Sequence, residues 1–161
     1  MNNNIIEVDI KSKEGIFNSF NENQISDELG NYIFVNAKKS STKAELVINI
    51  DNKIPFTEEE KEKLVDGIRE YFGLLVRSKL NYKKFNSIKK MILFMIGMLL
   101  ILLSEVLSDV VRLLIPEVIS IAGCVAIWES VTILLFIDSK NNYEIKKLKE
   151  LSECDINFTN N

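Results

Sequence analysis

One carboxylate, Glu129, lies alone in an apolar stretch from Val118 to Ile137, and its position needs a physical reason. A charged side chain at the centre of a bilayer costs about 2.5–3.5 kcal/mol on insertion scales, so such residues usually face a polar interior or a partner. If the spanning segment is instead 113–133, Glu129 lies only about one turn from the interface. The sequence therefore leaves two roles open for Glu129: an intramembrane polar site, or a side chain that extends to the membrane surface.

The other acids have simpler structural interpretations. Asp9 and Lys11 share the acid-x-lysine spacing of some metal-dependent nuclease strands, but no strand precedes them to supply a second acid. The acids from Glu58 to Glu62 lie where a helix is expected to begin, and the helix dipole favours them there without a metal. The chain has no histidine and no phosphate-binding glycine loop, nucleophile elbow or paired-cysteine spacing. We therefore expect no catalytic residue, no metal site, no cofactor and no enzymatic activity.

The two cysteines, Cys124 and Cys154, are not expected to form a disulfide. A thiol on the cytosolic side of a membrane stays reduced. Cys124 lies within an apolar stretch, where a free cysteine behaves as a small hydrophobic packing residue.

A basic run precedes the first apolar stretch, with no acid in it. Attraction to anionic lipid, about 1 kcal/mol for each charge near a membrane surface, accounts for such a run. Tyr82 and Phe85 are interleaved with the charges as groups able to stack on bases, so a nucleic-acid or nucleotide partner is the alternative. The total of 20 Lys+Arg against 23 Asp+Glu gives no global basic field, which favours membrane lipid as the partner. The run consists of Arg77, Lys79, Lys83, Lys84, Lys89 and Lys90.

The elements that hold these residues are separated by charge. Residues 91–137 contain only five charged residues, whereas the flanking sequence is rich in lysine, acids and asparagine. A helix needs about 20 mostly apolar residues to cross roughly 30 Å of hydrocarbon. The segments 88–107 and 115–137 meet this length, with Lys89 and Lys90 extending to one interface, and predict a transmembrane hairpin. A hairpin buried in a soluble domain is the alternative, although helices that are apolar on every side are typical of membranes.

Charge also predicts the orientation of this hairpin. The basic run precedes it, four lysines between residues 140 and 149 follow it, and the connection holds three acids against a single Arg112. The positive-inside rule then places both termini in the cytosol. The segment from Glu105 to Arg112 is either a helix in the outer interface or the last turns of a tilted first span.

Small residues predict how the two spans pack. Gly97 and Gly123 are about equally far from a turn near Val110, so they should lie at similar depth. Small residues let helices approach closely in lipid, where no hydrophobic force drives them together. We expect Ala122 and Ala126 to extend the same smooth face by one turn.

The part before the hairpin has an α/β pattern. Apolar and polar residues alternate over 6–10 and 46–50, which predicts two short strands. Between them Ser26 is a suitable helix N-cap, with acids in the following turn. A strand, a helix and a strand in so few residues predict a right-handed crossover and a parallel pair.

A long helix should follow. Thr57 and Glu60 have the spacing of a capping box, and no proline occurs between them and the end of the first span. The helix expected over 57–87 is therefore free to run on into that span. Gly73 and the polar stretch 81–87 are the places where it could be interrupted.

After the hairpin, residues 143–151 predict a helix and 154–158 a strand that returns to the same small sheet, with Asn141-Asn142 as a turn. The expected fold is an α+β membrane protein: a cytosolic strand-helix-strand domain, a two-helix hairpin and a C-terminal helix and strand. The domains are 1–87, with its long helix 57–87, then the hairpin 88–137, then the cytosolic segment 138–161.

Two stretches carry a family resemblance. Residues 24–33, QISDELGNYI, and 121–128, IAGCVAIW, which continue to ILLFID at 133–138, resemble a bacterial family of small, uncharacterised two-span membrane proteins with a cytosolic α/β domain. The resemblance covers most of the chain. It implies a bacterial cell membrane and a two-span topology, and it implies no reaction.

Two functions from different classes follow. The first is a non-enzymatic integral membrane protein whose cytosolic domain mediates assembly or partner binding, with the hairpin as its anchor. The alternative is a homo-oligomeric pore or channel, a defence or stress effector gated through the cytosolic domain and lined in part by Glu129. A single hairpin offers no aqueous path, so the pore requires several copies around an axis.

Overall fold

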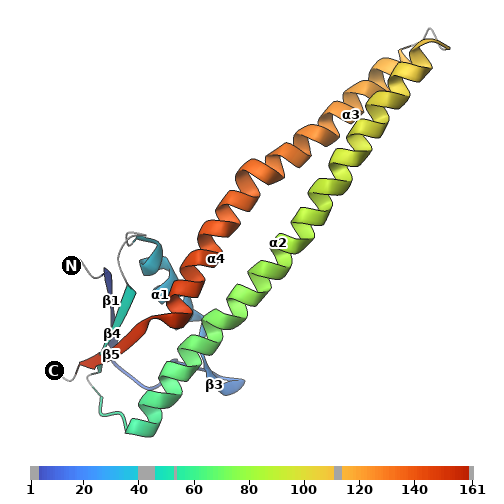
Figure 1. The fold of residues 1–161 in the computed structure, drawn as a ribbon. Helices are drawn as coiled ribbons and strands as arrows, with labels where there is room; N and C mark the ends of the chain where they lie inside the picture. Colours follow the sequence, from blue (N-terminus) through green and yellow to red (C-terminus); the bar gives the residue numbers. More distant parts are fainter. Residues whose placement is uncertain (1–3, 40–45, 53, 111–113, 160–161) are drawn as a thin grey trace. The chain divides into compact units, whose positions relative to one another are not determined.

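The computed structural model describes residues 4–39, 46–52, 54–110 and 114–159 (Figure 1). The chain is a mixed α+β protein that divides into two compact units. The first unit comprises residues 1–78 and 144–161, and the second comprises residues 79–143. The second unit extends beyond the hairpin predicted over 88–137 at both ends, so it includes charged sequence on either side of the apolar stretches.

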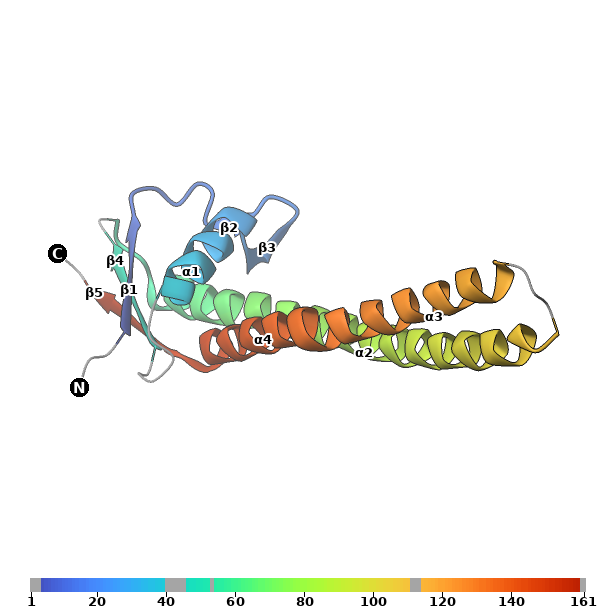
Figure 2. The ribbon, with the colours of Figure 1, turned by 90° about the horizontal axis from the view of Figure 1, so that it is seen from above.

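The first unit is built on a three-stranded parallel sheet (Figures 1 and 2). Its strands are β1 (Asn4–Ile10), β4 (Leu46–Asn52) and β5 (Asp155–Thr159), in the order β1-β4-β5. The parallel pairing of β1 with β4 confirms the predicted crossover through α1 (Asp27–Lys39). The parallel pairing of β4 with β5 confirms that the C-terminal strand returns to the same sheet.

The core of this unit lies on one face of the sheet. Strand residues on that face are buried because apolar side chains alternate along each strand. The helices contribute residues that recur every three or four positions along one side. The most deeply buried residues include Ile6, Ile48 and Ile50 of the sheet, Ile33 of α1, Leu64, Ile68 and Phe72 of α2, and Leu148 and Leu151 of α4.

The other face of the sheet is mostly polar, with Ile5 and Val47 as its apolar exceptions. Strand register places Glu7, Asn49 and Asn157 in one row across the sheet. The next row consists of Asp9, Asp51 and Thr159. These six residues are exposed or half-buried, so this face of the sheet is acidic and open among the residues that the structure describes.

A short antiparallel pair, β2 (Phe17–Asn18) and β3 (Asn21–Ile25), was not expected from the sequence. Gly15, with φ at +82°, precedes it in a conformation that favours glycine. Ile16 and Ile25 are buried in the core, while Phe20 at the turn is 98% exposed. This strand pair was missed because residues 21–24 are all polar, so they show no alternation of apolar and polar residues.

Both predicted helix starts are confirmed. The Ser26 hydroxyl accepts a hydrogen bond from the Leu29 amide at 3.3 Å, as an N-cap does. At the start of α2 (Glu58–Ser108), the Glu60 amide donates to the Thr57 hydroxyl and the Thr57 amide donates to the Glu60 carboxylate. These reciprocal bonds form the capping box.

Helix α2 is continuous for 51 residues, so neither Gly73 nor the 81–87 stretch interrupts it. Glu105 and Ser108 are in its last turns, which agrees with the second of the two interpretations of the connection, and Arg112 lies outside the described residues. No residue in the interior of α2 lacks a backbone N–H, which explains the continuity.

The return helix is also continuous, from Ile115 to Glu153. It comprises α3 (Ile115–Thr132), a π-helical turn η1 (Ile133–Ile137) and α4 (Asp138–Glu153). The prediction of a turn at Asn141-Asn142 was wrong, since both residues are within α4, which begins before the expected Tyr143. Asn141 is 5% exposed, so it does not lie in the exposed turn that its composition suggests.

Two helices of the chain, Glu58–Ser108 and Ile115–Glu153, are long and apolar enough to cross a membrane. This is a criterion of length and composition, and a long helix of a soluble protein also meets it.

Candidate functional site

In the second unit, the least exposed residues of α2 form a single stripe. Most of them follow one another at spacings of three or four residues, the pattern by which packed helices interlock their side chains. The partner residues on the return helix lie at similar spacings. The stripe on α2 comprises Lys79, Lys83, Asn86, Lys90, Leu93, Gly97, Leu100, Ile101, Ser104 and Leu107. We call this stripe, together with the buried residues of the return helix in the same unit, the seam.

The apolar part of the seam is centred on two glycines. A Cβ atom added to Gly97 would lie 2.8 Å from the Gly123 carbonyl oxygen, and one added to Gly123 would lie 2.8 Å from the Gly97 carbonyl oxygen. The structure therefore brings these two predicted residues together, backbone against backbone. Ala126 is half-buried, but Ala122 is exposed, so the expectation that Ala122 extends this face was wrong. Successive residues of a helix point about 100° apart, and Ala122 lies beside Gly123.

Two serine hydroxyls fix the ends of this apolar part. The Ser104 hydroxyl donates to the Pro116 carbonyl oxygen at 2.7 Å. The Ser130 hydroxyl donates to the Lys90 carbonyl oxygen at 2.9 Å. Hydroxyls that bond across helices stabilise helix pairs in apolar surroundings.

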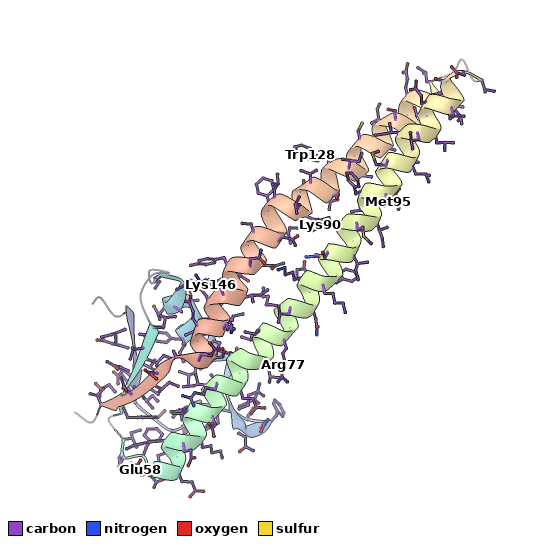
Figure 3. All side chains as sticks on the ribbon, viewed as in Figure 1. Glu58, Arg77, Lys90, Met95, Trp128 and Lys146 are labelled. Carbon is purple, nitrogen blue, oxygen red and sulfur yellow. The ribbon has the colours of Figure 1, made fainter. Side chains whose placement is uncertain are left out.

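An ion pair follows Ser130 in the seam. The Lys90 ammonium donates to the Asp138 carboxylate at 2.7 Å, and the two side chains are 23% and 12% exposed. Lys90 directly precedes the apolar stretch of α2 that begins at Met91, and Asp138 directly follows Ile137. Figure 3 shows Lys90 between the two helices, whereas Met95 and Trp128 point away from them. The ion pair therefore lies at the end of both apolar stretches, at the same level along the two helices.

Two buried asparagines lie one turn beyond this pair. Asn86 and Asn141 are each 5% exposed. Asn86 is four residues before Lys90 and Asn141 is three residues after Asp138, so on antiparallel helices both lie on the same side of the pair. The Nδ2 atoms of both asparagines and Oδ1 of Asp138 are buried and have no hydrogen-bond partner among the described residues. We call Asn86, Lys90, Asp138 and Asn141 the polar cluster.

The π-turn orients Asp138. The Asp138 amide donates to the Ile133 carbonyl oxygen, a bond that spans five residues instead of four. Ile133 and Asp138 are both buried, one above the other in the seam. In a regular α-helix Ile137 would follow Ile133 on this face and Asp138 would point about 100° away. The extra residue therefore brings the carboxylate to Lys90.

Glu129 lies outside the seam. Its carboxylate is 3.6 Å from the Lys89 ammonium, and the two side chains are 49% and 47% exposed. Glu129 is thus close to the basic end of the first apolar stretch, beside Trp128, which is 70% exposed.

The basic run does not form one surface. Lys79, Lys83 and Lys90 lie in the seam, whereas Lys84 and Lys89 are exposed. Arg77 belongs to the first unit and is exposed as well. Only part of the run is therefore accessible to an external ligand.

No group of three or more His, Cys, Asp or Glu residues is placed to hold a metal ion within the described part of the chain. Asp9 and Lys11 line an open hollow of 430 Å³ with Tyr32 at the end of β1. Cys124 and Cys154 are free, and Cys154 is buried. Burial raises the pKa of the Cys154 thiol to about 11, so it stays protonated near neutral pH and is a poor nucleophile.

We expect Glu129→Gln to change stability little, because an exposed ion pair is worth about 0.2–1 kcal/mol. The measurement is the free energy of unfolding in detergent, with Ser139→Ala, an exposed change on the same helix, as the control. A loss of more than about 2 kcal/mol would mean that Glu129 makes a contact that exposed pairs do not make.

Comparisons with family models, with curated proteins and with solved structures found no match to this chain. Its own residues therefore carry the functional inference.

Proposed function

We propose that this chain is an integral membrane protein, anchored by the hairpin of α2 and α3, whose α/β unit lies on the cytosolic side and binds a partner or assembles. One observation carries the proposal: the apolar stretches are exposed. Only 6% of the most apolar window of Glu58–Ser108 and 17% of that of Ile115–Glu153 is buried within the chain.

Exposure of this extent needs an apolar surrounding. Soluble monomers rarely expose contiguous apolar patches larger than a few hundred Å². Lipid removes this cost, and within each continuous helix the backbone N–H and C=O groups bond to one another, as an apolar surrounding requires. The exposed apolar side chains include Met91, Ile92, Phe94, Met95, Leu99, Leu102, Val118, Ile121, Val125 and Trp128.

The polar side chains at one end of the hairpin support a position for the apolar stretches within the membrane. Lys90 and Asp138 close the apolar stretches at one end, with Lys89, Glu129 and Trp128 near the same level. Lysine and tryptophan side chains are favoured at a membrane interface. This favours the interfacial role of Glu129 over an intramembrane site.

The binding role of the α/β unit is supported by its sheet. Parallel sheets usually have both faces covered, and here the face with Glu7, Asp9 and Asp51 is open among the described residues. Its acidic character suits a partner with a basic surface.

The geometry supports the anchor better than a pore. A pore of several copies needs polar side chains along an exposed face of the hairpin. Among the described residues, the exposed positions over 91–103 and 118–128 are all apolar, and the serines at 104 and 130 bond within the hairpin.

Topology reporters test the proposal. A reporter active only outside the membrane should be silent when fused after Asn161 and active when inserted near Asp109, because the flanks are basic and the connection is acidic. A second reporter, active only in the cytosol, should give the opposite pattern. Silence of the first reporter at both positions would favour the soluble hairpin, and the reversed pattern would overturn the orientation.

A further inference from the structure

We propose that the outer edge of β5 binds the same edge of a second copy of this chain, so that two three-stranded sheets join into one continuous six-stranded sheet. The two β5 strands are antiparallel and related by a two-fold axis at Asn157. This inference rests on the proposed function and deepens it, because it names the partner with which the α/β unit assembles. Sheets of four to six strands are the commonest size, and mixed sheets are common among large ones.

The outer edge of β5 is free to accept another strand. β5 lies at one margin of the sheet and, among the described residues, pairs with β4 alone (Figure 1). An edge strand presents unpaired N–H and C=O groups, which proteins usually protect with lysine, proline or a bulge. The β5 sequence DINFT contains neither lysine nor proline, and its register with β4 is regular over all five residues. This edge therefore lacks the usual protection against pairing.

The opposite margin of the sheet, formed by β1, is less suited to self-association. The Tyr32 hydroxyl donates to the Glu7 carbonyl oxygen at 3.2 Å, so a side chain of α1 already bonds to this strand. An antiparallel second copy centred on Glu7 would place two Glu7 carboxylates opposite each other, and one centred on Val8 would place Glu7 opposite Asp9. Like charges that lie directly opposite each other destabilise a strand pair. The structure therefore favours β5 as the edge that pairs.

The sequence of β5 is complementary to itself in antiparallel register. A pair centred on Asn157 includes all five residues and places Asp155 opposite Thr159 of the second copy. The threonine hydroxyl can donate to the aspartate carboxylate, and the two Asn157 amides can bond to each other. The two Asp155 carboxylates lie four residues apart along the strands, about 13 Å. This exceeds the distance of about 8 Å over which physiological salt screens exposed charges.

Apolar side chains support the same register on the other face of β5. Ile156 and Phe158 pack against the core but are only half-buried, whereas their neighbours Asp155, Asn157 and Thr159 are exposed. In the proposed register Ile156 lies opposite Phe158 of the second copy, and directly opposite side chains share one face of a sheet. An aromatic and a β-branched side chain in such positions stabilise a strand pair. The pairing therefore extends the core of each copy toward that of the other.

Cysteine cross-linking of the full chain in lipid vesicles tests the register. In a chain that carries Cys124→Ala and Cys154→Ala, Asn157→Cys should form a disulfide-linked dimer on oxidation, because directly opposite residues are about 4.5–5.5 Å apart at Cα. Asp155→Cys, on the same strand and face, is the control and should not cross-link to itself across about 13 Å. Equal dimer yields from the two variants, or no dimer from Asn157→Cys, would overturn the proposal.

A charge exchange at the axis tests self-pairing without a covalent bond. Energy transfer between copies labelled at the N-terminus, measured at increasing protein-to-lipid ratio, gives the dissociation constant. Asn157→Asp and Asn157→Lys should each weaken pairing at least about tenfold, because each places like charges opposite each other. An equal mixture of the two variants should pair about as tightly as the parent, since opposite charges then meet at the axis.

Asn49→Asp and Asn49→Lys are the matched controls, on the neighbouring strand and the same face of the sheet. Both should leave the dissociation constant unchanged. Equal weakening by the Asn49 and Asn157 variants, or no recovery in the mixture, would overturn the proposal. An absence of energy transfer in the parent would do the same.

These measurements are independent of the test of the proposed function. The topology reporters decide the membrane anchor, and neither cross-linking nor energy transfer reports on orientation. Failure to cross-link at Asn157, together with the expected reporter pattern, would overturn the pairing of β5 and leave the anchor intact.

Discussion

Gly123→Leu is expected to destabilise the hairpin by about 3 kcal/mol or more, at the upper end of the cost of overpacking. A Cβ atom at this position would lie 2.8 Å from the Gly97 carbonyl oxygen and 2.9 Å from Cγ1 of Ile101. The first of these atoms belongs to the backbone of α2, so the clash is relieved only by moving the helices apart. The measurement is the free energy of unfolding in detergent, or the melting temperature.

Ile121→Leu is the matched control, because it keeps side-chain volume and Ile121 is 64% exposed. Ala122→Leu adds bulk one residue away from Gly123 on an exposed position, and should cost less than about 0.5 kcal/mol. Equal losses in Gly123→Leu and Ala122→Leu would show that the close approach of the two glycines does not hold the helices together.

Local signals account for what the sequence predicted correctly. The N-cap at Ser26 and the capping box of Thr57 and Glu60 depend on residues within three positions of each other. Most residues of β1 and β4 alternate between apolar and polar, with Ile5 and Val47 as exceptions, because one face of the sheet is buried and the other is mostly polar. The return of β5 followed from the same alternation in a short segment.

The features that were missed depend on contacts between distant residues. Lys90 and Asp138 are 48 positions apart, and nothing near either one indicates the other. Asn141 and Asn142 have the composition of a turn, and the burial of Asn141 within α4 cannot be read from the residues beside it. Polar residues at Asn86 and Lys90 also hid the seam, since a hydrophobic pattern cannot reveal a polar interface.

The packed face of the apolar stretches could not be predicted from the sequence for the opposite reason. When nearly every residue is apolar, periodicity no longer distinguishes the seam from the exposed surface. The pair Gly97 and Gly123 was predictable because small residues are informative in such a background. Ala122 was assigned to this face from its depth along the helix alone, without considering the direction in which its side chain points.

Asp138→Leu is expected to cost about 3–5 kcal/mol, because it leaves the mostly covered Lys90 ammonium without its counter-charge. Lys90→Leu should cost a similar amount for the converse reason. The double variant should cost clearly less than the two single variants together, since two apolar side chains then face each other. The free energy of unfolding of all four proteins gives the coupling between the two residues.

The exposed pair of Lys89 and Glu129 provides the comparison on the same two helices. Its coupling, measured through Lys89→Leu, Glu129→Leu and the double variant, should not exceed about 1 kcal/mol, because both side chains are about half exposed. Each of the two double-mutant cycles pairs a lysine of α2 with an acid on the return helix. The difference between their coupling energies therefore measures the effect of burial on such an ion pair. Equal couplings would mean that water reaches Lys90 and Asp138 as freely as it reaches Glu129, and the π-turn would then have no buried ion pair to form.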